Sequence, residues 1–289
     1  MLKRTIFIFV VLLSATTLGL ANHTRLATLM AGDYIDDVVM TDIYPHRMLA
    51  YRNTIYLDIT PGPEDFGIFF SPFAKYGVLG VWQNPVPVNG FNLGYAVNIF
   101  KFGVGASVSP VKDNLRLGIG VGRDFFNQYA EISYLTLDGT PDKWHRVTAR
   151  YLHRMADFSI VPRYSADFVM EPYDYAKHRF GVMVQRTILN EGFVYLGAEY
   201  EAGRGDIEFD STRIHAGVEM KLSRIFVLRC GVAERFTGSL ENGQWQVEPG
   251  IGVRVRDFSV DLHLNKDRFF DKEQTFFKSV GLDFNFGRF

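Results

Sequence analysis

Regular alternation of apolar and charged residues is the feature of this sequence that most constrains its fold. The clearest example runs from Thr212 to Leu222 and reads T-R-I-H-A-G-V-E-M-K-L. Successive side chains of a β-strand point to opposite faces, so this stretch has one apolar face and one charged face. Its length also suits a tilted strand that crosses a bilayer, which needs about 9–11 residues. The pattern fits a membrane barrel or a soluble sandwich.

The same pattern recurs along most of the chain, with turn residues between the copies. The candidate strands are Tyr51–Ile59, Phe66–Phe73, Tyr76–Gln83, Asn92–Lys101, Phe102–Ser109, Leu115–Asp124, Gln128–Leu137, His145–Arg154, Asp157–Ala166, His178–Thr187, Phe193–Glu201, Thr212–Leu222, Arg224–Phe236, Gln246–Arg256, Phe258–Lys266 and Phe277–Gly287. The first two are short and lie on either side of Pro61 and Pro63.

The connections between these stretches favour the membrane barrel. Tight turns, such as Met155-Ala156, alternate with longer loops, such as Asp167–Lys177 and Ala202–Ser211. Outer-membrane barrels have short periplasmic turns and longer extracellular loops, whereas a Greek-key sandwich has no reason to keep this order. We therefore predict an all-β fold, a transmembrane antiparallel up-and-down β-barrel over residues 51–289, with an even strand number.

The N-terminus has the pattern of a secretory signal. Lys3 and Arg4 precede the apolar run from Ile6 to Leu13, and Gly19-Leu20-Ala21 offers small residues for cleavage. The apolar run is well short of the roughly 20 residues that a membrane-spanning helix needs. We predict a signal peptide at residues 1–21 and an exported mature chain.

Residues 22–50 do not alternate like a strand. They include Leu26, Leu29, Ile35 and Val38, and such a number of apolar residues is too high for a flexible leader. We expect a compact N-terminal segment with a helical turn or two that precedes the barrel.

In a membrane barrel the apolar faces meet lipid and the charged faces line the interior. The candidate lumen residues are Arg116, Arg146, Arg150, Arg179, Arg213, Glu219, Arg229, Arg254 and Arg256. They could line a passage for anionic or amphipathic solutes, or they could form an ion-pair network that fills the barrel. Gly118, Gly120 and Gly122 share one face of a strand and leave room for a plug or for neighbouring side chains.

The last predicted strand carries Phe284 and Phe286 on one face, and the chain ends on Phe289. An aromatic C-terminal residue on an amphipathic final strand resembles the assembly signal of bacterial outer-membrane barrels, which implies contact with the barrel-assembly machinery. Phe289 has the opposite parity to Phe286, so a bulge at Gly287 is needed to bring them to the same face.

Several kinds of chemistry have no support in the sequence. The net charge of -1 gives no basis for binding nucleic acid, and the single Cys230 excludes an intramolecular disulfide and a cysteine-rich metal site. The seven histidines have no metal-ligand spacing, and no serine–histidine constellation is recognisable. We predict no metal, no cofactor and no enzymatic activity.

Asp36-Asp37, followed eight residues later by Pro45, resembles the N-terminal plug region of FadL-like outer-membrane proteins, which include PorV-type proteins. The family pattern reads Asp-Asp, a short linker and Asn-Pro-Ala, and here Tyr44 and His46 stand at the Asn and Ala positions. The resemblance implies a barrel of about 14 strands in the outer membrane of a Gram-negative bacterium, with residues 22–50 folded into the lumen.

Two functions follow from this resemblance and from the charged interior. The first is a channel or transporter for small solutes, which are hydrophobic or amphipathic by family resemblance and polar or anionic by the charged lumen. The second is a structural or docking barrel with a filled lumen, as PorV-type relatives are for secreted cargo. We predict about 14 strands, with 16 as the alternative, and a monomer in the lipid bilayer.

Overall fold

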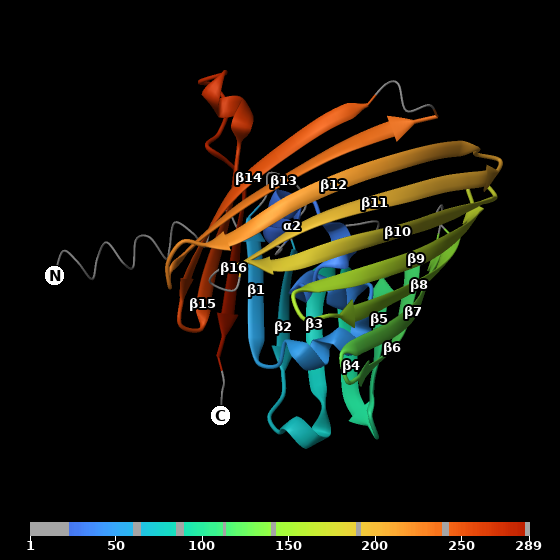
Figure 1. The fold of residues 1–289 in the computed structure, drawn as a ribbon. Helices are drawn as coiled ribbons and strands as arrows, with labels where there is room; N and C mark the ends of the chain where they lie inside the picture. Colours follow the sequence, from blue (N-terminus) through green and yellow to red (C-terminus); the bar gives the residue numbers. More distant parts are fainter. Residues whose placement is uncertain are drawn as a thin grey trace.

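The computed structural model describes residues 23–59, 65–84, 90–111, 114–139, 143–188, 192–238 and 243–286. Within these residues, antiparallel strands form one closed barrel, and β16 closes the ring against β1 (Figure 1). The strands are β1 (Thr54–Ile59), β2 (Asp65–Phe70), β3 (Val78–Asn84), β4 (Gly90–Ile99), β5 (Phe102–Val111), β6 (Asn114–Phe125), β7 (Gln128–Gly139), β8 (Lys143–Arg154), β9 (Phe158–Glu171), β10 (Tyr175–Ile188), β11 (Gly192–Gly205), β12 (Phe209–Lys221), β13 (Phe226–Thr237), β14 (Gln244–Val255), β15 (Phe258–Leu264) and β16 (Phe277–Asn285). The predicted signal peptide, Gly287 and Phe289 lie outside the described residues.

The barrel has 16 strands, so the prediction of about 14 is wrong and the alternative of 16 is correct. The difference comes from β1 and β2, which are short but pair on both sides: β1 with β16 and β2, and β2 with β3. The smaller number came from the family resemblance. Alternation alone gives the correct number, because even a short strand can complete a closed ladder.

Several strands are longer than the sequence predicts, and two loops expected to be long are mostly strand. Asp167–Lys177 was expected as a loop, but β9 and β10 continue through most of it, with Asp167 directly across from Lys177. The Lys177 ammonium lies 3.3 Å from the Asp167 carboxylate. Polar residues do not end a strand here, because a barrel wall can continue beyond the apolar band with charged side chains that pair across the ladder.

The outer and inner faces of the wall differ as the alternation predicts. Apolar side chains such as Ile119, Ile132 and Leu196 are exposed on the outside, whereas Glu131 and Arg229 are buried on the inside. In a soluble protein charged residues are almost never the buried set. This inverted distribution suits a closed ladder of strands surrounded by hydrocarbon.

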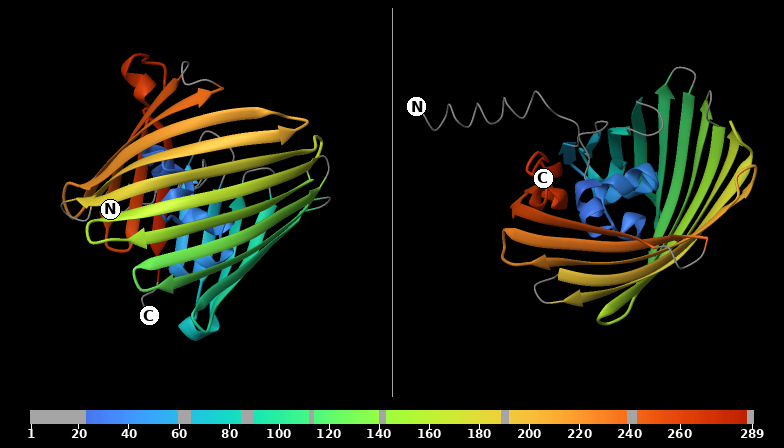
Figure 2. Two further views of the ribbon diagram at one scale, coloured as in Figure 1. Left: turned by 45° about the vertical axis from the view of Figure 1, so that its right-hand side comes forward. Right: turned by 90° about the horizontal axis from the view of Figure 1, so that it is seen from above.

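The N-terminal segment, residues 23–50, lies inside the ring of strands, as the view from above shows (Figure 2). It consists of α2 (His23–Leu29) and three short 3-10 helices, η1 (Gly32–Tyr34), η2 (Val38–Asp42) and η3 (Pro45–Ala50). α2 packs against β12–β16, and η3 packs against β3–β6. Among the described residues, no helix is long and apolar enough to cross a membrane.

The two ends of the barrel have different connections. At one end, called the turn end, lie the tight turns at residues 100–101, 126–127 and 256–257, the start of β1 and the end of β16. At the other end, called the loop end, β15 and β16 are joined by the longest described connection, which contains η6 (Lys266–Phe269). The red helical segment that projects from the barrel in Figure 1 is part of this connection.

Candidate functional site

A buried carboxylate on β7 joins the N-terminal segment to the wall. Glu131 has a fully buried side chain and accepts hydrogen bonds from Arg150 of β8 and from Arg47 of the segment, both at 2.6 Å. The Nε2 atom of His46 lies 3.0 Å from the same carboxylate. Arg150 also reaches Asp36 of the segment, at 2.5 Å. One wall carboxylate therefore holds the second half of the segment in place.

A second ion-pair cluster holds the first half of the segment. Glu219 of β12 accepts from Arg229 of β13 at 2.6 Å and from Arg25 of α2 at 2.9 Å. Arg229 extends the cluster to Asp261 of β15, and Arg25 extends it to Asp37, with a distance of 3.0 Å between Nη1 and Oδ2. The charges of these side chains are balanced by partners a few ångströms away, as buried charges require.

Further polar contacts join the segment to other parts of the wall. Arg116 of β6 pairs with Asp42 at 2.7 Å. Arg163 of β9 pairs with Asp33 at 2.6 Å. At the start of α2, the Thr24 backbone N–H donates to Asp58 of β1 at 2.9 Å. Polar contacts therefore join the segment to strands around much of the ring, from β1 to β12.

Glycines on the inner face allow the segment to approach the wall closely. A Cβ atom at Gly105 would lie 2.6 Å from the Cα of His46, and one at Gly231 would lie 2.5 Å from the carbonyl carbon of Leu29. Both distances are shorter than real Cβ contacts, and both neighbours are backbone atoms. Gly120 lies beside His46 and Pro45 in the same way. The positions of these glycines match the path of the segment.

Two titratable groups of the segment respond to this environment in specific ways. Burial alone would raise the pKa of the Asp36 carboxyl, but the guanidinium groups of Arg150 and Arg47 outweigh it, and the pKa is below its ordinary value. Burial lowers the pKa of His46, although the Glu131 carboxylate opposes this effect. The ionised Asp36 and the neutral His46 are therefore the forms that the docked segment favours.

A cavity of about 510 Å³ lies on the loop-end side of the segment. Its floor is formed by the mostly apolar segment residues Leu26, Ala27, Met30, Gly32, Asp33, Met40 and Ile43, and its wall carries Arg146, Thr148, Arg163, Arg179, Arg213, Glu248 and His263. This volume is within the range of about 300–1,000 Å³ that is typical of small-molecule sites. An apolar floor beneath a cationic wall suits an amphipathic anion.

Most arginines of this cavity are neutralised by carboxylates, but Arg213 is not. Arg146 pairs with Asp167 at 2.5 Å, and Arg179 pairs with Glu201 at 2.6 Å. Arg213 donates to the Met30 carbonyl at 2.7 Å, and no carboxylate of the described residues lies within ion-pair distance of it. Glu199, directly across the strand pair from Arg213, pairs with Arg163 and Arg179 instead.

The other sequence-predicted residues lie at the turn end or in the segment. Arg254 lies 3.8 Å from Glu219, and Arg256 is in the tight turn between β14 and β15 rather than on a strand, with a φ of 54°. Pro45 begins η3 and packs near Gly105 and Gly120. The rings of Phe284 and Phe286 stack at the turn end, with centroids 6.5 Å apart.

Sequence reasoning missed the charged residues that the segment itself contributes. Arg25, Asp33, Asp42 and Arg47 each bind an oppositely charged wall residue. The signal for them was present, because charges interspersed in an apolar stretch must find partners if that stretch is buried. Trp82 of β3 is buried in the lumen, where its indole N–H donates to Asp42.

Among the residues that the structure describes, no three histidine, cysteine, aspartate or glutamate side chains are placed to hold a metal ion. His145 points outward from β8 and contacts Tyr134 at 2.7 Å, so it does not face the lumen with the other charged groups.

Comparison with known proteins places the fold among outer-membrane barrels. No protein-family model and no curated protein matches the sequence. Among solved structures, a bacterial polysaccharide outer membrane secretin aligns with a TM-score of 0.56 and 9% identity, over 81% of this chain and 97% of that chain. A porin aligns with a TM-score of 0.51 and 11% identity, over 81% and 92% of the two chains.

A third structure is that of OmpT, an outer membrane protein of Vibrio cholerae, in a mutant that lacks loop L8. It aligns with a TM-score of 0.50 and 9% identity, over 80% of this chain and 96% of that chain. At these identities the likeness concerns the fold. The chain has the closed antiparallel barrel fold of outer-membrane porins, and the particular solute route must be argued from its own residues.

Proposed function

We propose that this chain is an outer-membrane barrel that binds small amphipathic anions at its loop end and passes them inward, with residues 22–50 acting as the plug. The turn end, with the start of β1 and the end of β16, faces the periplasm, and the loop end faces the outside of the cell. The exposed apolar wall and the barrel fold shared with outer-membrane proteins support this location, and the tight turns at one end and the longer connection at the other support the orientation.

The observation that carries the proposal is the unneutralised guanidinium of Arg213 above an apolar floor. A guanidinium group recognises carboxylate and phosphate groups through two parallel hydrogen bonds. A solute with such a group and an apolar tail would satisfy both parts of the cavity. Passage further inward then requires the segment to move, because hydrogen bonds and ion pairs bind it to wall strands from β1 to β12.

The signal peptide, contact of Phe284, Phe286 and Phe289 with the barrel-assembly machinery, and a monomeric state remain part of this proposal. Membership of the FadL-like family is supported by the position of the segment that contains Asp36, Asp37 and Pro45, but not by the strand number. A docking barrel of PorV type is the second candidate, and the dense ion pairing of the lumen favours it.

The test is calorimetric titration of the detergent-folded protein with decanoate, and with decanol as the neutral analogue. We expect decanoate to bind about ten-fold more tightly than decanol, because a hydrogen-bonded charge contributes about 1.5–3 kcal/mol. Arg213→Gln should remove this preference.

Arg235→Gln is the matched control, because Arg235 lies next to Arg213 across the strand pair, is exposed, pairs with Glu201 and does not line the apolar cavity. It should bind decanoate like the unmodified protein. Equal binding of both ligands, or unchanged binding by Arg213→Gln, would contradict the proposed anion site. A folded protein that binds neither ligand would favour the docking barrel.

A further inference from the structure

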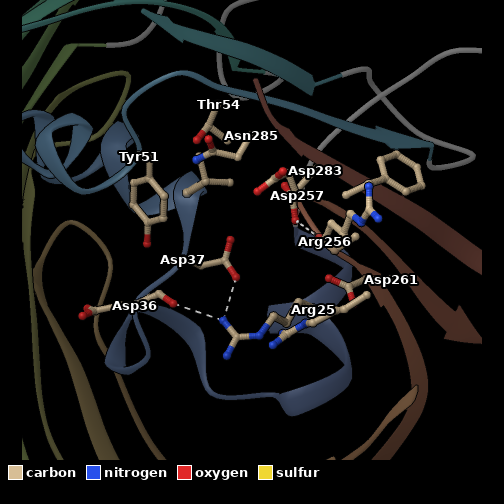
Figure 3. A pocket seen from close by; sticks show the side chains of 14 residues that line it. Arg25, Asp36, Asp37, Tyr51, Thr54, Arg256, Asp257, Asp261, Asp283 and Asn285 are labelled. Carbon is tan, nitrogen blue, oxygen red and sulfur yellow. Dashed lines mark hydrogen bonds and ion pairs between the residues drawn. The ribbon is translucent and has the colours of Figure 1, made fainter. Parts of the chain in front are cut away.

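A second cavity lies at the turn end, on the opposite side of the N-terminal segment from the first. Its volume is about 340 Å³, at the small end of the range for small-molecule sites. It is lined by Arg25, Asp36, Asp37, Val38 and Tyr51 of the segment and its continuation, and by Thr54, Arg254, Arg256, Asp257, Phe258, Ser259, Asp261, Asp283 and Asn285 of the wall (Figure 3). No group of the proposed function uses this cavity.

Asp37 presents an unsatisfied carboxylate oxygen in this cavity. The residue is 4% exposed, and its Oδ2 atom pairs with Arg25 at 3.0 Å. Its Oδ1 atom is buried and accepts no hydrogen bond from a side chain of the described residues. Figure 3 shows Asp37 near the centre of the cavity, with one oxygen directed away from Arg25. A buried acceptor without a partner is costly, so this atom points to a missing donor.

The environment of Asp37 favours an additional positive charge. Burial raises the pKa of its carboxyl group, and the nearby Asp261 carboxylate adds to this effect, although the guanidinium of Arg25 and a hydrogen bond with the Val38 backbone oppose it. Arg25 divides its hydrogen bonds between Asp37, Glu219 and the Asp36 carbonyl oxygen. The ionised carboxylate is therefore only partly compensated, and a cationic donor at Oδ1 would stabilise it.

The rim of the same cavity presents a complementary cation. Arg256 lies in the β14–β15 turn, and no carboxylate of the described part of the chain is within ion-pair distance of its guanidinium. Arg254, its neighbour on β14, reaches only Glu219, at 3.8 Å. A free guanidinium at the rim is suited to a ligand carboxylate.

A single metal ion does not suit this arrangement. Among the described residues no three metal-ligating side chains converge, and the cavity is far larger than one ion. A simple anion would leave the buried Asp37 oxygen without a donor, and a simple amine would make no contact with the exposed guanidinium of Arg256 at the rim. We propose that this cavity binds a small zwitterion of the amino-acid type, with its ammonium group on Asp37 and its carboxylate on Arg256. This site is independent of the anion site at Arg213.

The experiment is calorimetric titration of the full detergent-folded chain with L-alanine, propionate and ethylamine. The two latter probes each lack one of the charged groups of alanine. We expect alanine to bind at least about ten-fold more tightly than either, because each charged group adds a charge-assisted contact. Asp37→Asn and Arg256→Gln should each weaken alanine binding by about ten-fold.

Asp37→Asn removes the ion pair between Asp37 and Arg25, both of the segment, and so could loosen the segment. Arg256→Gln changes a turn residue outside any described ion pair, so this variant tests the site without loosening the segment. Asp167→Asn, at the loop end, is the control and should bind alanine normally. The proposal is overturned if alanine does not bind, if all three probes bind equally, or if Arg256→Gln binds as the unmodified protein does. Arg213→Gln should leave alanine binding unchanged, so this proposal and the anion site can fail separately.

Discussion

At the scale of single residues, the lumen depends on a few carboxylates that each bind several side chains. Glu131 is the clearest case, because its fully buried carboxylate contacts Arg47, Arg150 and His46. Replacing it by glutamine leaves two buried guanidinium groups without their shared partner. Removal of one partner from a buried ion pair costs about 3–5 kcal/mol. We expect Glu131→Gln to lower the free energy of unfolding by about this amount, measured by urea titration of the detergent-folded protein.

Arg235→Gln is the matched control for this measurement. Its pair with Glu201 is partly exposed, with 55% of the Arg235 side chain accessible, and such pairs contribute at most about 1 kcal/mol. If both variants lost the same small amount of stability, Glu131 would not be the central connection between wall and segment.

The sequence predicts which face each arginine occupies, but not its partner. Alternation places Arg116, Arg150 and Arg229 inward, and all three are buried. Their partners depend on the register of the ladder and on the path of the segment. Arg116, for example, pairs with Asp42, which is 74 residues earlier in the chain. Local periodicity contains no information about such a contact.

At the scale of elements, η3 can pack closely against β5 because position 105 is a glycine and has no side chain. A Cβ atom at Gly105 would clash with the backbone of Pro45 and His46, which cannot move like a flexible side chain. We expect Gly105→Ala to displace η3 while the barrel remains folded. Limited trypsin digestion should then cleave at Arg47 at least about ten-fold faster, because local opening controls cleavage.

Gly103→Ala, two residues away on the same face of β5, is the control for this experiment. A Cβ atom there would lie 3.1 Å from the end of the Leu49 side chain and farther from all other atoms, so a small adjustment suffices. Equal cleavage rates in the two variants would show that Gly105 does not determine how closely η3 approaches the wall.

The ends of strands were predictable only where the apolar alternation of the outer face also ends. The tight turns at residues 126–127 and 256–257 were expected within a residue, because alternation is broken there on both sides. The loop-end boundaries of β9 and β10 were not, since charged residues that pair across the ladder have the composition of a loop. Polarity therefore marks the edge of the apolar band on the outer wall better than it marks the end of a strand.

At the scale of the whole molecule, the segment and the barrel form one electrostatic unit. Residues 22–50 contain four aspartates, Asp33, Asp36, Asp37 and Asp42, and two arginines, Arg25 and Arg47. The segment therefore brings a net charge of -2 into a lumen in which Arg116, Arg150 and Arg163 pair with it. Its removal would both open the lumen and leave these arginines without those partners.

This balance makes a definite prediction for the protein without residues 22–50. We expect discrete conductance steps in a planar bilayer, with a preference for anions under a salt gradient. The reason is that the exposed arginines would concentrate anions in a channel with low-dielectric walls. The complete chain should be silent or conduct far less in the same bilayer. Since the deletion could also prevent folding, resistance to trypsin and the β-sheet circular dichroism signal must first show that the barrel has formed. A folded deletion variant that stays closed would mean that wall side chains alone fill the lumen, which is what a docking barrel requires. A cation-selective channel would show that the acidic wall residues, and not the arginines, determine the ion preference of the opened passage.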